Sequence, residues 1–304
     1  MTRVAAIDCG TNSIRLLIAD IDNGEFKEIV RSMEVVRLGQ GVDKNKLFQP
    51  DAIDRTLAAV DNFNEEIVSK SVEKIRFCAT SATRDAKNRS LFTDGVKNIL
   101  GVEVEVIPGD EEAKLSYFGA TKGLKQSDAP FLVVDIGGGS TEFVYGHEKV
   151  EFAKSVDIGC VRMSERHLNT QPATMDQVAR AIVDIDKAIA QAAAIVPISA
   201  AKTLIAVAGT ATTVAAAALE LKEYDRNLIH LSRISADKVY KVSAMLQSMQ
   251  KNEIAELGYM HPGRVDVITA GSLVLSRVMA ATGASEFVAS ESDILDGMAW
   301  SLVD

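Results

Sequence analysis

Two stretches of this 304-residue chain follow one pattern: Val4-Ala-Ala-Ile-Asp8-Cys-Gly10-Thr11-Asn12-Ser13 and Leu132-Val-Val-Asp135-Ile-Gly137-Gly138-Gly139-Ser140-Thr141-Glu142. In each, an apolar run leads to an aspartate and then to a turn of small and hydroxylated residues, and a second apolar run follows. The pattern is typical of a β-hairpin whose tip binds phosphate, because glycines let the backbone approach an anion and hydroxyls add donors. Two such tips facing each other across a cleft would hold an oligophosphate from both sides.

Composition places the chain among ordinary globular proteins, with 47% apolar and 25% charged residues. The formal net charge of −9 argues against nucleic acid or an anionic membrane surface as a general partner, because both need a basic face. A basic cluster at Arg84, Lys87 and Arg89 is the local exception. It is explained either by a solvated loop or by a focused phosphate site.

No part of the sequence predicts membrane insertion or secretion. The first residues lack the apolar core of a signal peptide, and the most hydrophobic region, 204–221, consists mainly of Ala and Thr and ends near Glu220. Three cysteines, Cys9, Cys78 and Cys160, are scattered without metal-binding spacing. We therefore expect reduced thiols and a cytoplasmic location.

Strand-like runs dominate the start of the chain, and helical periodicity alternates with them later. Helices are predicted at 51–69, from about Ser90 to a stop at Gly101, from Gly109, and at 175–196. A length of 304 residues suits two α/β domains. The polar stretch 122–130 predicts domains at 1–124 and 125–304; whether the C-terminal helix packs back on the first domain is left open.

Several residues could carry chemistry. Asp135 and Glu142 flank the triple glycine, and two hard carboxylates suit Mg²⁺ that bridges substrate phosphates. A structural glycine hairpin would also explain this segment, although the similar pattern at residues 8–13 favours phosphate. Glu111-Glu112 opens a helix, where acids complement the helix dipole, and a carboxylate there is also a candidate general base for water.

A third strand-to-helix junction occurs at Gly209-Thr210-Ala-Thr212. Its amides would form an anion site at a helix N-terminus, or the segment is simply a tight turn. Arg264 and Asp266 form either a buried ion pair or a phosphate contact, and their positions in the sequence do not decide between these.

Together these residues resemble the exopolyphosphatase/guanosine pentaphosphate phosphatase family of the actin-like ATPase superfamily. The resemblance spans almost the whole chain in family order. The matching motifs are Asp8-Cys-Gly10-Thr11-Asn12-Ser13, Ala79-Thr-Ser-Ala-Thr83-Arg84, Gly109-Asp110-Glu111-Glu112-Ala113, Asp135-Ile-Gly137-Gly-Gly-Ser140-Thr141-Glu142, Gly209-Thr210-Ala-Thr212 and Arg264-Val-Asp266-Val-Ile268.

The resemblance implies two ribonuclease-H-like domains with the active site in the cleft between them. It also implies that Glu112 is the general base and that Asp135 and Glu142 serve Mg²⁺. Phosphates would be held by Arg84 and by the loops at 10–13 and 138–141. With the helix N-terminus at Gly209-Thr210 added, the candidate phosphate-binding residues besides Arg84 are Gly10, Thr11, Asn12, Ser13, Gly137, Gly138, Gly139, Ser140, Thr141, Gly209 and Thr210.

Two departures from the family pattern matter. Many relatives continue into a helical C-terminal region that extends the channel for long polyphosphate, whereas this sequence stops at Asp304. The last family motif commonly reads Gly-x-x-Arg-Glu-Gly, whereas here it reads Ser292-Asp-Ile-Leu295-Asp296-Gly297, without the arginine. The first departure favours short polyphosphate as the substrate, and because of the second the family's substrate affinity does not carry over to this chain.

The predicted activity is a Mg²⁺-dependent exopolyphosphatase that releases terminal orthophosphate from linear polyphosphate. A guanosine pentaphosphate 5′-phosphohydrolase would use the same terminal phosphoanhydride chemistry, although no motif in the sequence is specific for guanine. An ATP-dependent kinase and a non-catalytic sensor of nucleotide or polyphosphate would also be compatible with the fold. The resemblance allows a homodimer, and no stretch identifies an interface.

Overall fold

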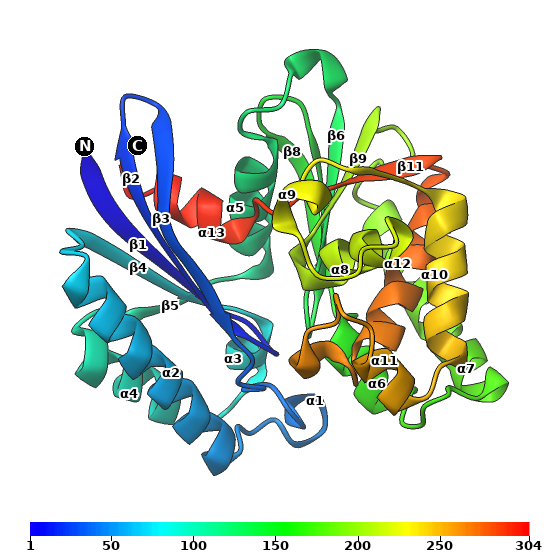
Figure 1. The fold of residues 1–304 in the computed structure, drawn as a ribbon, viewed down its shortest axis with the longest axis horizontal. Helices are drawn as coiled ribbons and strands as arrows, with labels where there is room; N and C mark the ends of the chain where they lie inside the picture. The colour runs from blue at the N-terminus through cyan, green and yellow to red at the C-terminus, as the bar shows by residue number, and fades with distance from the viewer. Residues whose placement is uncertain (304) are drawn as a thin grey trace. The chain divides into compact units, whose positions relative to one another are not determined.

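The computed structural model describes residues 1–303, which form two compact units. Unit 1 comprises Met1–Gly119 together with the residues from Ile294 onward, and unit 2 comprises Ala120–Asp293. The division therefore falls inside a helix, whereas the sequence pattern predicts it at 124/125. Each unit contains one mixed β-sheet with helices packed on it (Figure 1).

Unit 1 has a five-stranded sheet of order β3-β2-β1-β4-β5. β1 pairs antiparallel with β2 and parallel with β4. The strands are β1 Thr2–Cys9, β2 Ile14–Asp22, β3 Glu25–Glu34, β4 Lys74–Ala79 and β5 Val104–Val106. The helices are α1 Val42–Asn45, α2 Pro50–Ser69, α3 Ser81–Asp85, α4 Ser90–Leu100, α5 Gly109–Thr121 and α13 Ile294–Trp300.

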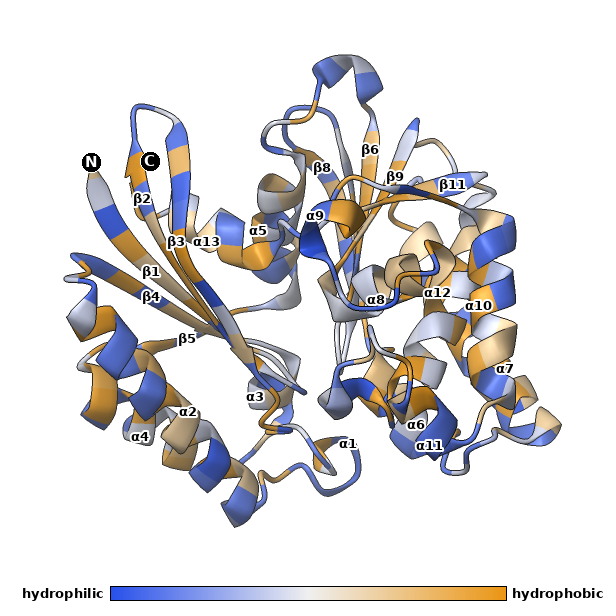
Figure 2. Cartoon of the chain, in the orientation of Figure 1, coloured by the Kyte–Doolittle hydropathy of each residue, from blue (hydrophilic) through white to orange (hydrophobic). Residues whose placement is uncertain are grey.

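The sheet of unit 1 has an apolar core on each face. Ala5 and Ile7 of β1 lie in a core with the apolar stripe of α2, including Phe63, whereas Val4 of β1 lies in a second core with α13. Figure 2 shows hydrophobic and hydrophilic residues interleaved along α2, as its amphipathic pattern predicts. The C-terminal helix, whose place the sequence leaves open, therefore packs on the sheet of unit 1.

Unit 2 repeats this arrangement in a six-stranded sheet of order β10-β11-β9-β6-β7-β8. The strands are β6 Phe131–Ile136, β7 Thr141–Gly146, β8 Val150–Val156, β9 Thr203–Val207, β10 Arg233–Ser235 and β11 Glu286–Ala289. The helices are η1 Gln126–Asp128, α6 Cys160–Arg166, α7 Met175–Ala193, α8 Ala208–Ala218, α9 Arg226–Ile229, α10 Ala236–Ser248, α11 Lys251–Ala255, η2 Pro262–Arg264 and α12 Ile268–Thr282.

The two sheets share one topology. In both, an antiparallel meander of three strands (β1-β2-β3 or β6-β7-β8) continues from its first strand into parallel neighbours (β4-β5 or β9-β11). The prediction of two ribonuclease-H-like α/β domains is thereby confirmed.

The structure bears on two expectations from the sequence, the reduced state of the cysteines and the lack of a membrane-spanning helix. All three cysteines are free and buried, and burial raises the pKa of the Cys9 and Cys160 thiols. Within residues 1–303, no helix combines the length and apolar character that crossing a membrane requires.

Candidate functional site

The first predicted phosphate loop is the tip of the β1–β2 hairpin. Cys9 pairs with Ile14 at the end of the ladder. The amide of Gly10 then donates to the carbonyl of Ser13 across the tip, with a distance of 3.0 Å from N to O. Gly10–Ser13 is therefore a four-residue turn, as its composition predicts.

The second predicted loop has the same geometry at the tip of the β6–β7 hairpin. Ile136 pairs with Thr141, and the amide of Gly137 donates to the carbonyl of Ser140 at 3.1 Å. The two motifs that are alike in sequence are thus alike in structure, one in each unit.

The carbonyl groups of the second tip are held by the start of α6. The carbonyl of Gly137 accepts from the amide of residue 160 at 3.0 Å, and that of Gly138 accepts from the amide of residue 161 at 2.9 Å. The carbonyl of Gly139 accepts from Nε of Arg162 at 2.6 Å. In a trans peptide the N–H points opposite to the C=O of the same plane. The amides of residues 138–140 therefore point away from α6, in the arrangement that binds anions.

The first tip is held in an equivalent way by the segment after β3. The amide of Arg37 donates to the carbonyl of Asn12, and the amide of Gly39 donates to the carbonyl of Thr11, both at 2.8 Å. The amides of Asn12 and Ser13 consequently point away from this segment. In both units, hydrogen bonds to the tip carbonyls from a neighbouring segment leave the tip amides pointing away from that segment.

This support depends on two glycines that the sequence motifs do not include. A Cβ on Gly159 would lie 2.5 Å from the backbone of Gly138, and a Cβ on Gly39 would lie 2.4 Å from Cγ2 of Thr11. Any side chain at either position must displace the tip. No periodicity marks these glycines; the only signal is their place just after the third strand of each meander.

Two of the tip hydroxyls, those of Thr11 and Thr141, have protein partners. Thr141 donates to the carbonyl of Ile158 at 2.7 Å, and Oγ1 of Thr11 lies 2.9 Å from Oγ of Ser81. The O–H proton of Thr141 is therefore engaged within the protein. The main-chain amides of the tips remain as donors for phosphate.

Asp135 and Glu142 lie directly opposite each other in the β6–β7 ladder. Both are buried, with exposed fractions of 6% and 1%. Directly opposed residues of an antiparallel pair project to the same face, with Cβ atoms about 5 Å apart. Oε1 of Glu142 accepts a hydrogen bond of 2.7 Å from Oγ of Ser155 on β8.

This donor set fits a magnesium ion. Mg²⁺ is commonly held by one or two carboxylates together with waters and substrate phosphates. Asp135 and Glu142 supply two adjacent carboxylates beside an amide-lined tip. No group of three or more His, Cys, Asp or Glu suited to a metal occurs among residues 1–303, so the described part of the chain has no all-protein cage.

The two adjacent glutamates at the start of α5 have different surroundings. Oε2 of Glu112 accepts a hydrogen bond of 2.7 Å from Nη1 of Arg84, and the residue is 8% exposed. Glu111 instead pairs with Arg76 at 2.7 Å, and its side chain is 43% exposed. The predicted base and the predicted phosphate-binding arginine are therefore in direct contact, whereas Glu111 belongs to a surface ion-pair network.

Arg84 is fixed by its second partner, the carbonyl of Ile107, at 2.9 Å. It lies in α3, directly after β4 and next to the first tip, since the amide of Thr80 bonds to the carbonyl of Cys9. Lys87 and Arg89, the rest of the basic cluster, are exposed residues beyond the end of α3.

The third predicted loop, Gly209-Thr210, begins α8 after β9. Arg264 lies against it: Nη1 donates to the carbonyl of Gly209 and to Oγ1 of Thr213, both at 2.9 Å. A Cβ on Gly209 would lie 2.1 Å from Nη2 of Arg264. The absence of a side chain at Gly209 thus leaves room for the guanidinium of Arg264. The sequence alone did not decide what Arg264 contacts.

Thr210 faces the interior of unit 2. It is 4% exposed, and its Oγ1 would lie 2.7 Å from a Cβ added to Gly271 of α12. A phosphate at this loop would therefore meet main-chain amides, as at the two hairpin tips.

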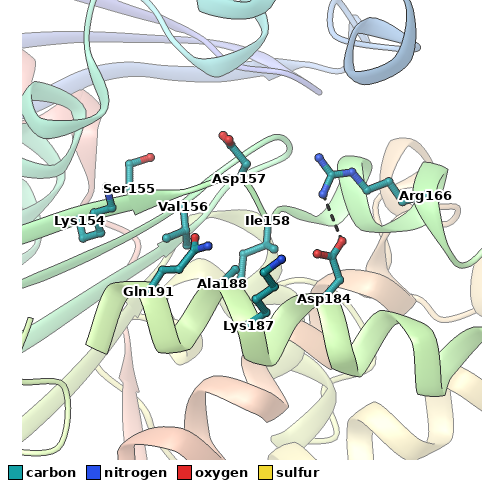
Figure 3. Close-up of a pocket in the computed structure, with 10 residues that line it drawn as sticks. All are labelled: Lys154, Ser155, Val156, Asp157, Ile158, Arg166, Asp184, Lys187, Ala188 and Gln191. Carbon is teal, nitrogen blue, oxygen red and sulfur yellow. Dashed lines mark hydrogen bonds and ion pairs between the residues drawn. The ribbon is translucent and has the colours of Figure 1, made fainter. Parts of the chain in front are cut away.

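A hollow of about 340 Å³ lies in unit 2 between β8 and α7 (Figure 3). Three cationic side chains, Lys154, Arg166 and Lys187, line it together with two aspartates. Burial alone would raise the pKa of Asp184, but hydrogen bonds from His167 and Arg166 outweigh it and hold that pKa below its usual value. Asp184 is therefore ionised and paired with Arg166 at 3.2 Å. No motif in the sequence indicates this hollow.

Comparison with known proteins identifies relatives of this chain. A model of the Ppx/GppA phosphatase family matches residues 17–304. The Mycobacterium tuberculosis protein named exopolyphosphatase 2 is 44% identical over 99% of both chains. A Pseudoalteromonas atlantica protein named guanosine-5′-triphosphate,3′-diphosphate pyrophosphatase is 34% identical over 62% of this chain and 38% of its own length.

A solved structure of an exopolyphosphatase-like protein superposes with a TM-score of 0.96 at 44% identity. The superposition covers 99% of this chain and 97% of the other. The chain belongs to the Ppx/GppA phosphatase family.

Proposed function

We propose that the protein is an exopolyphosphatase, a phosphoanhydride hydrolase that releases terminal orthophosphate from linear polyphosphate. The observation that carries the proposal is the 2.7 Å contact between Arg84 and Glu112. It places a carboxylate that can accept a proton from water beside a guanidinium that can bind a phosphate. The full-length similarity to a protein named exopolyphosphatase 2 supports the same substrate class.

Glu112 acts as the general base in this proposal. A terminal phosphate that engages Arg84 competes with Glu112 for the guanidinium, because each arginine N–H serves one strong acceptor. Release of the Glu112 carboxylate lets it orient a water for in-line attack on the terminal phosphorus and take its proton. In this proposal the Glu112 carboxylate therefore acts as a base only when substrate has taken its place on Arg84.

The loop amides hold the phosphates and the charge that develops on them. Amides of residues 138–140 in unit 2 and of residues 12–13 in unit 1 point away from their supporting segments. Fixed donors of this kind stabilise developing negative charge without reorganisation. Arg84 adds a positive charge on the transferring group.

Asp135 and Glu142 are the residues that would hold Mg²⁺. The ion supplies charge neutralisation on the phosphate oxygens when it is bound. The two carboxylates would hold it beside the second tip.

Polyphosphate is favoured over guanosine pentaphosphate because the relative named exopolyphosphatase 2 matches 99% of this chain, whereas the guanosine relative matches 62%. A sensor that binds polyphosphate without turnover is the competing hypothesis from another functional class.

The test is orthophosphate release with Mg²⁺ from short polyphosphate, long polyphosphate, guanosine pentaphosphate and ATP, measured in parallel. Glu112→Gln should lower release by about 10²- to 10⁴-fold, the usual contribution of a positioned base. Glu111→Gln is the matched control, since Glu111 is exposed and bound to Arg76; it should retain most activity.

Each contrary outcome assigns a different function. Release from the nucleotide alone would identify a guanosine pentaphosphate phosphohydrolase. Saturable polyphosphate binding without release would identify a sensor, and full activity of Glu112→Gln would refute the base assignment.

A further inference from the structure

Three polar residues form one row across the sheet of unit 2. Asp135 of β6 lies opposite Glu142 of β7, and Glu142 lies opposite Ser155 of β8. Residues directly opposed in antiparallel ladders share a face of the sheet. The row therefore reads carboxylate, carboxylate, hydroxyl on a single face.

The hydroxyl at the end of this row contacts the central carboxylate. Ser155 Oγ donates to Glu142 Oε1 at 2.7 Å, a short distance that is typical of a charge-assisted O–H···O⁻ bond. Ser155 therefore engages one of the two carboxylate oxygens. Glu142 is 1% exposed, so water does not compete freely for these oxygens.

Neighbouring structure fixes Ser155 in turn. It lies near the carboxyl end of β8, and just beyond it Thr141 of β7 donates to the carbonyl of Ile158 at 2.7 Å. β8 is also the wall of the hollow in Figure 3, whose lining includes Ser155. Ser155 thus lies in a strand that joins the hollow to the acidic pair.

We infer that Ser155 is a positioning residue for the metal ligand Glu142. Its hydroxyl holds Oε1, fixes the plane of the carboxylate and thereby sets how the second oxygen is presented beside Asp135. This inference rests on the proposed metal role of Asp135 and Glu142. Residues that orient a metal ligand from behind typically contribute 10- to 100-fold to metal affinity.

The experiment measures Mn²⁺ binding by electron paramagnetic resonance in the presence of orthophosphate, together with the Mg²⁺ dependence of phosphate release. Ser155→Ala should weaken Mn²⁺ binding about 10-fold or more and raise the half-saturating Mg²⁺ concentration similarly. At saturating Mg²⁺ its kcat should recover toward the wild-type value. Ser155→Thr keeps the hydroxyl and suits a strand, so it should bind Mn²⁺ like the wild type.

Ser32→Ala is the matched control, because Ser32 is a half-buried strand serine whose Oγ has no hydrogen-bond partner among the described residues. It should leave Mn²⁺ binding unchanged. Urea unfolding without metal checks that each variant is folded. Ser155→Cys, which preserves size, replaces Ser155→Ala in the comparison if the alanine variant is unfolded.

The outcomes separate this inference from the function on which it rests. Unchanged Mn²⁺ binding in Glu142→Gln would overturn the proposed metal site itself. Weakened binding in Glu142→Gln with wild-type binding in Ser155→Ala would overturn the role of Ser155 alone. Failure of Ser155→Thr to bind like the wild type would also overturn it, because the hydroxyl is then not what matters.

Discussion

Asp8 and Arg15 lie opposite each other in the β1–β2 ladder, with Arg15 Nη2 2.6 Å from Asp8 Oδ2. The same ladder position in the β6–β7 hairpin carries Asp135 and Glu142. One hairpin therefore neutralises its aspartate with a guanidinium, and the other sets a second carboxylate beside it. The two copies of the motif therefore differ in charge. Unit 1 has an ion pair at this position, and unit 2 has two carboxylates suited to a cation.

The ion pair in unit 1 is expected to matter for stability. Arg15→Met would leave Asp8, which is 5% exposed, without its guanidinium, and we expect a loss of about 2–4 kcal/mol in the free energy of unfolding. Urea unfolding measures it. Arg55→Met breaks an exposed pair with Asp51 and should cost less than about 1 kcal/mol. Equal losses for the two variants would contradict the structural difference.

The acidic pair should control the metal requirement. Asp135→Asn removes one charge from the proposed Mg²⁺ ligands, so the Mg²⁺ concentration for half-maximal phosphate release should rise about 10-fold or more. Asp8→Asn changes the equivalent position in unit 1, where Arg15 already occupies the carboxylate. Its Mg²⁺ titration should stay at the wild-type midpoint, and a shift as large as that of Asp135→Asn would contradict the assignment to unit 2.

The contact between Arg84 and Glu112 predicts opposite effects on binding and turnover. Glu112→Gln removes a negative charge that competes with phosphate for Arg84, so we expect polyphosphate to bind several-fold more tightly while turnover falls. Isothermal titration calorimetry at low ionic strength measures the affinity. Weaker binding by Glu112→Gln would show that the resting ion pair does not compete with substrate.

Gly159 should be intolerant of even the smallest side chain. In Gly159→Ala the new Cβ meets the backbone of Gly138 at 2.5 Å, whereas in Gly10→Ala the nearest atom is 3.6 Å away. We expect Gly159→Ala to lose about 1–3 kcal/mol of unfolding free energy and Gly10→Ala distinctly less. Thermal unfolding compares the two; equal effects would mean that the second tip moves freely.

Local pattern predicted much of the fold. The apolar stripe at 51–69, with Pro50 at its start, became α2 at Pro50–Ser69. Gly101 ends α4 with φ of 71°, a conformation that favours glycine. The repeated Asp-turn motifs became two hairpins with the same closing hydrogen bond. These features depend on residues that are close together in the chain, and for that reason the sequence alone predicts them.

Tertiary contacts were beyond the reach of that pattern. Nothing in the sequence placed Ser155 beside Glu142, because strand register depends on the whole sheet. The altered last motif also has a structural consequence: Leu295 packs in the core under α13, and Asp296 pairs with Arg31 at 2.7 Å. Residues that depart from the family pattern there serve packing of unit 1.

A half-buried acid in unit 2, Glu291, makes stability depend on pH. Burial raises the pKa of Glu291 above its usual value, although a 2.5 Å hydrogen bond from Tyr224 and the charge of Arg226 act against the rise. Its folded pKa exceeds its unfolded pKa. The folded state therefore favours the protonated acid, and this contribution to stability is complete below about pH 4 and is lost as the pH rises through the folded pKa.

Glu291→Gln removes that titration and keeps an oxygen that can accept from Tyr224. The variant's unfolding free energy minus that of the wild type should therefore increase as the pH rises from about 4 toward neutrality. Urea unfolding at a series of pH values measures the difference. Glu286→Gln, at an exposed surface pair with Arg233, is the control and should show a much flatter difference. A difference for Glu291→Gln that falls with rising pH would mean that Tyr224 and Arg226 stabilise the carboxylate more than burial destabilises it.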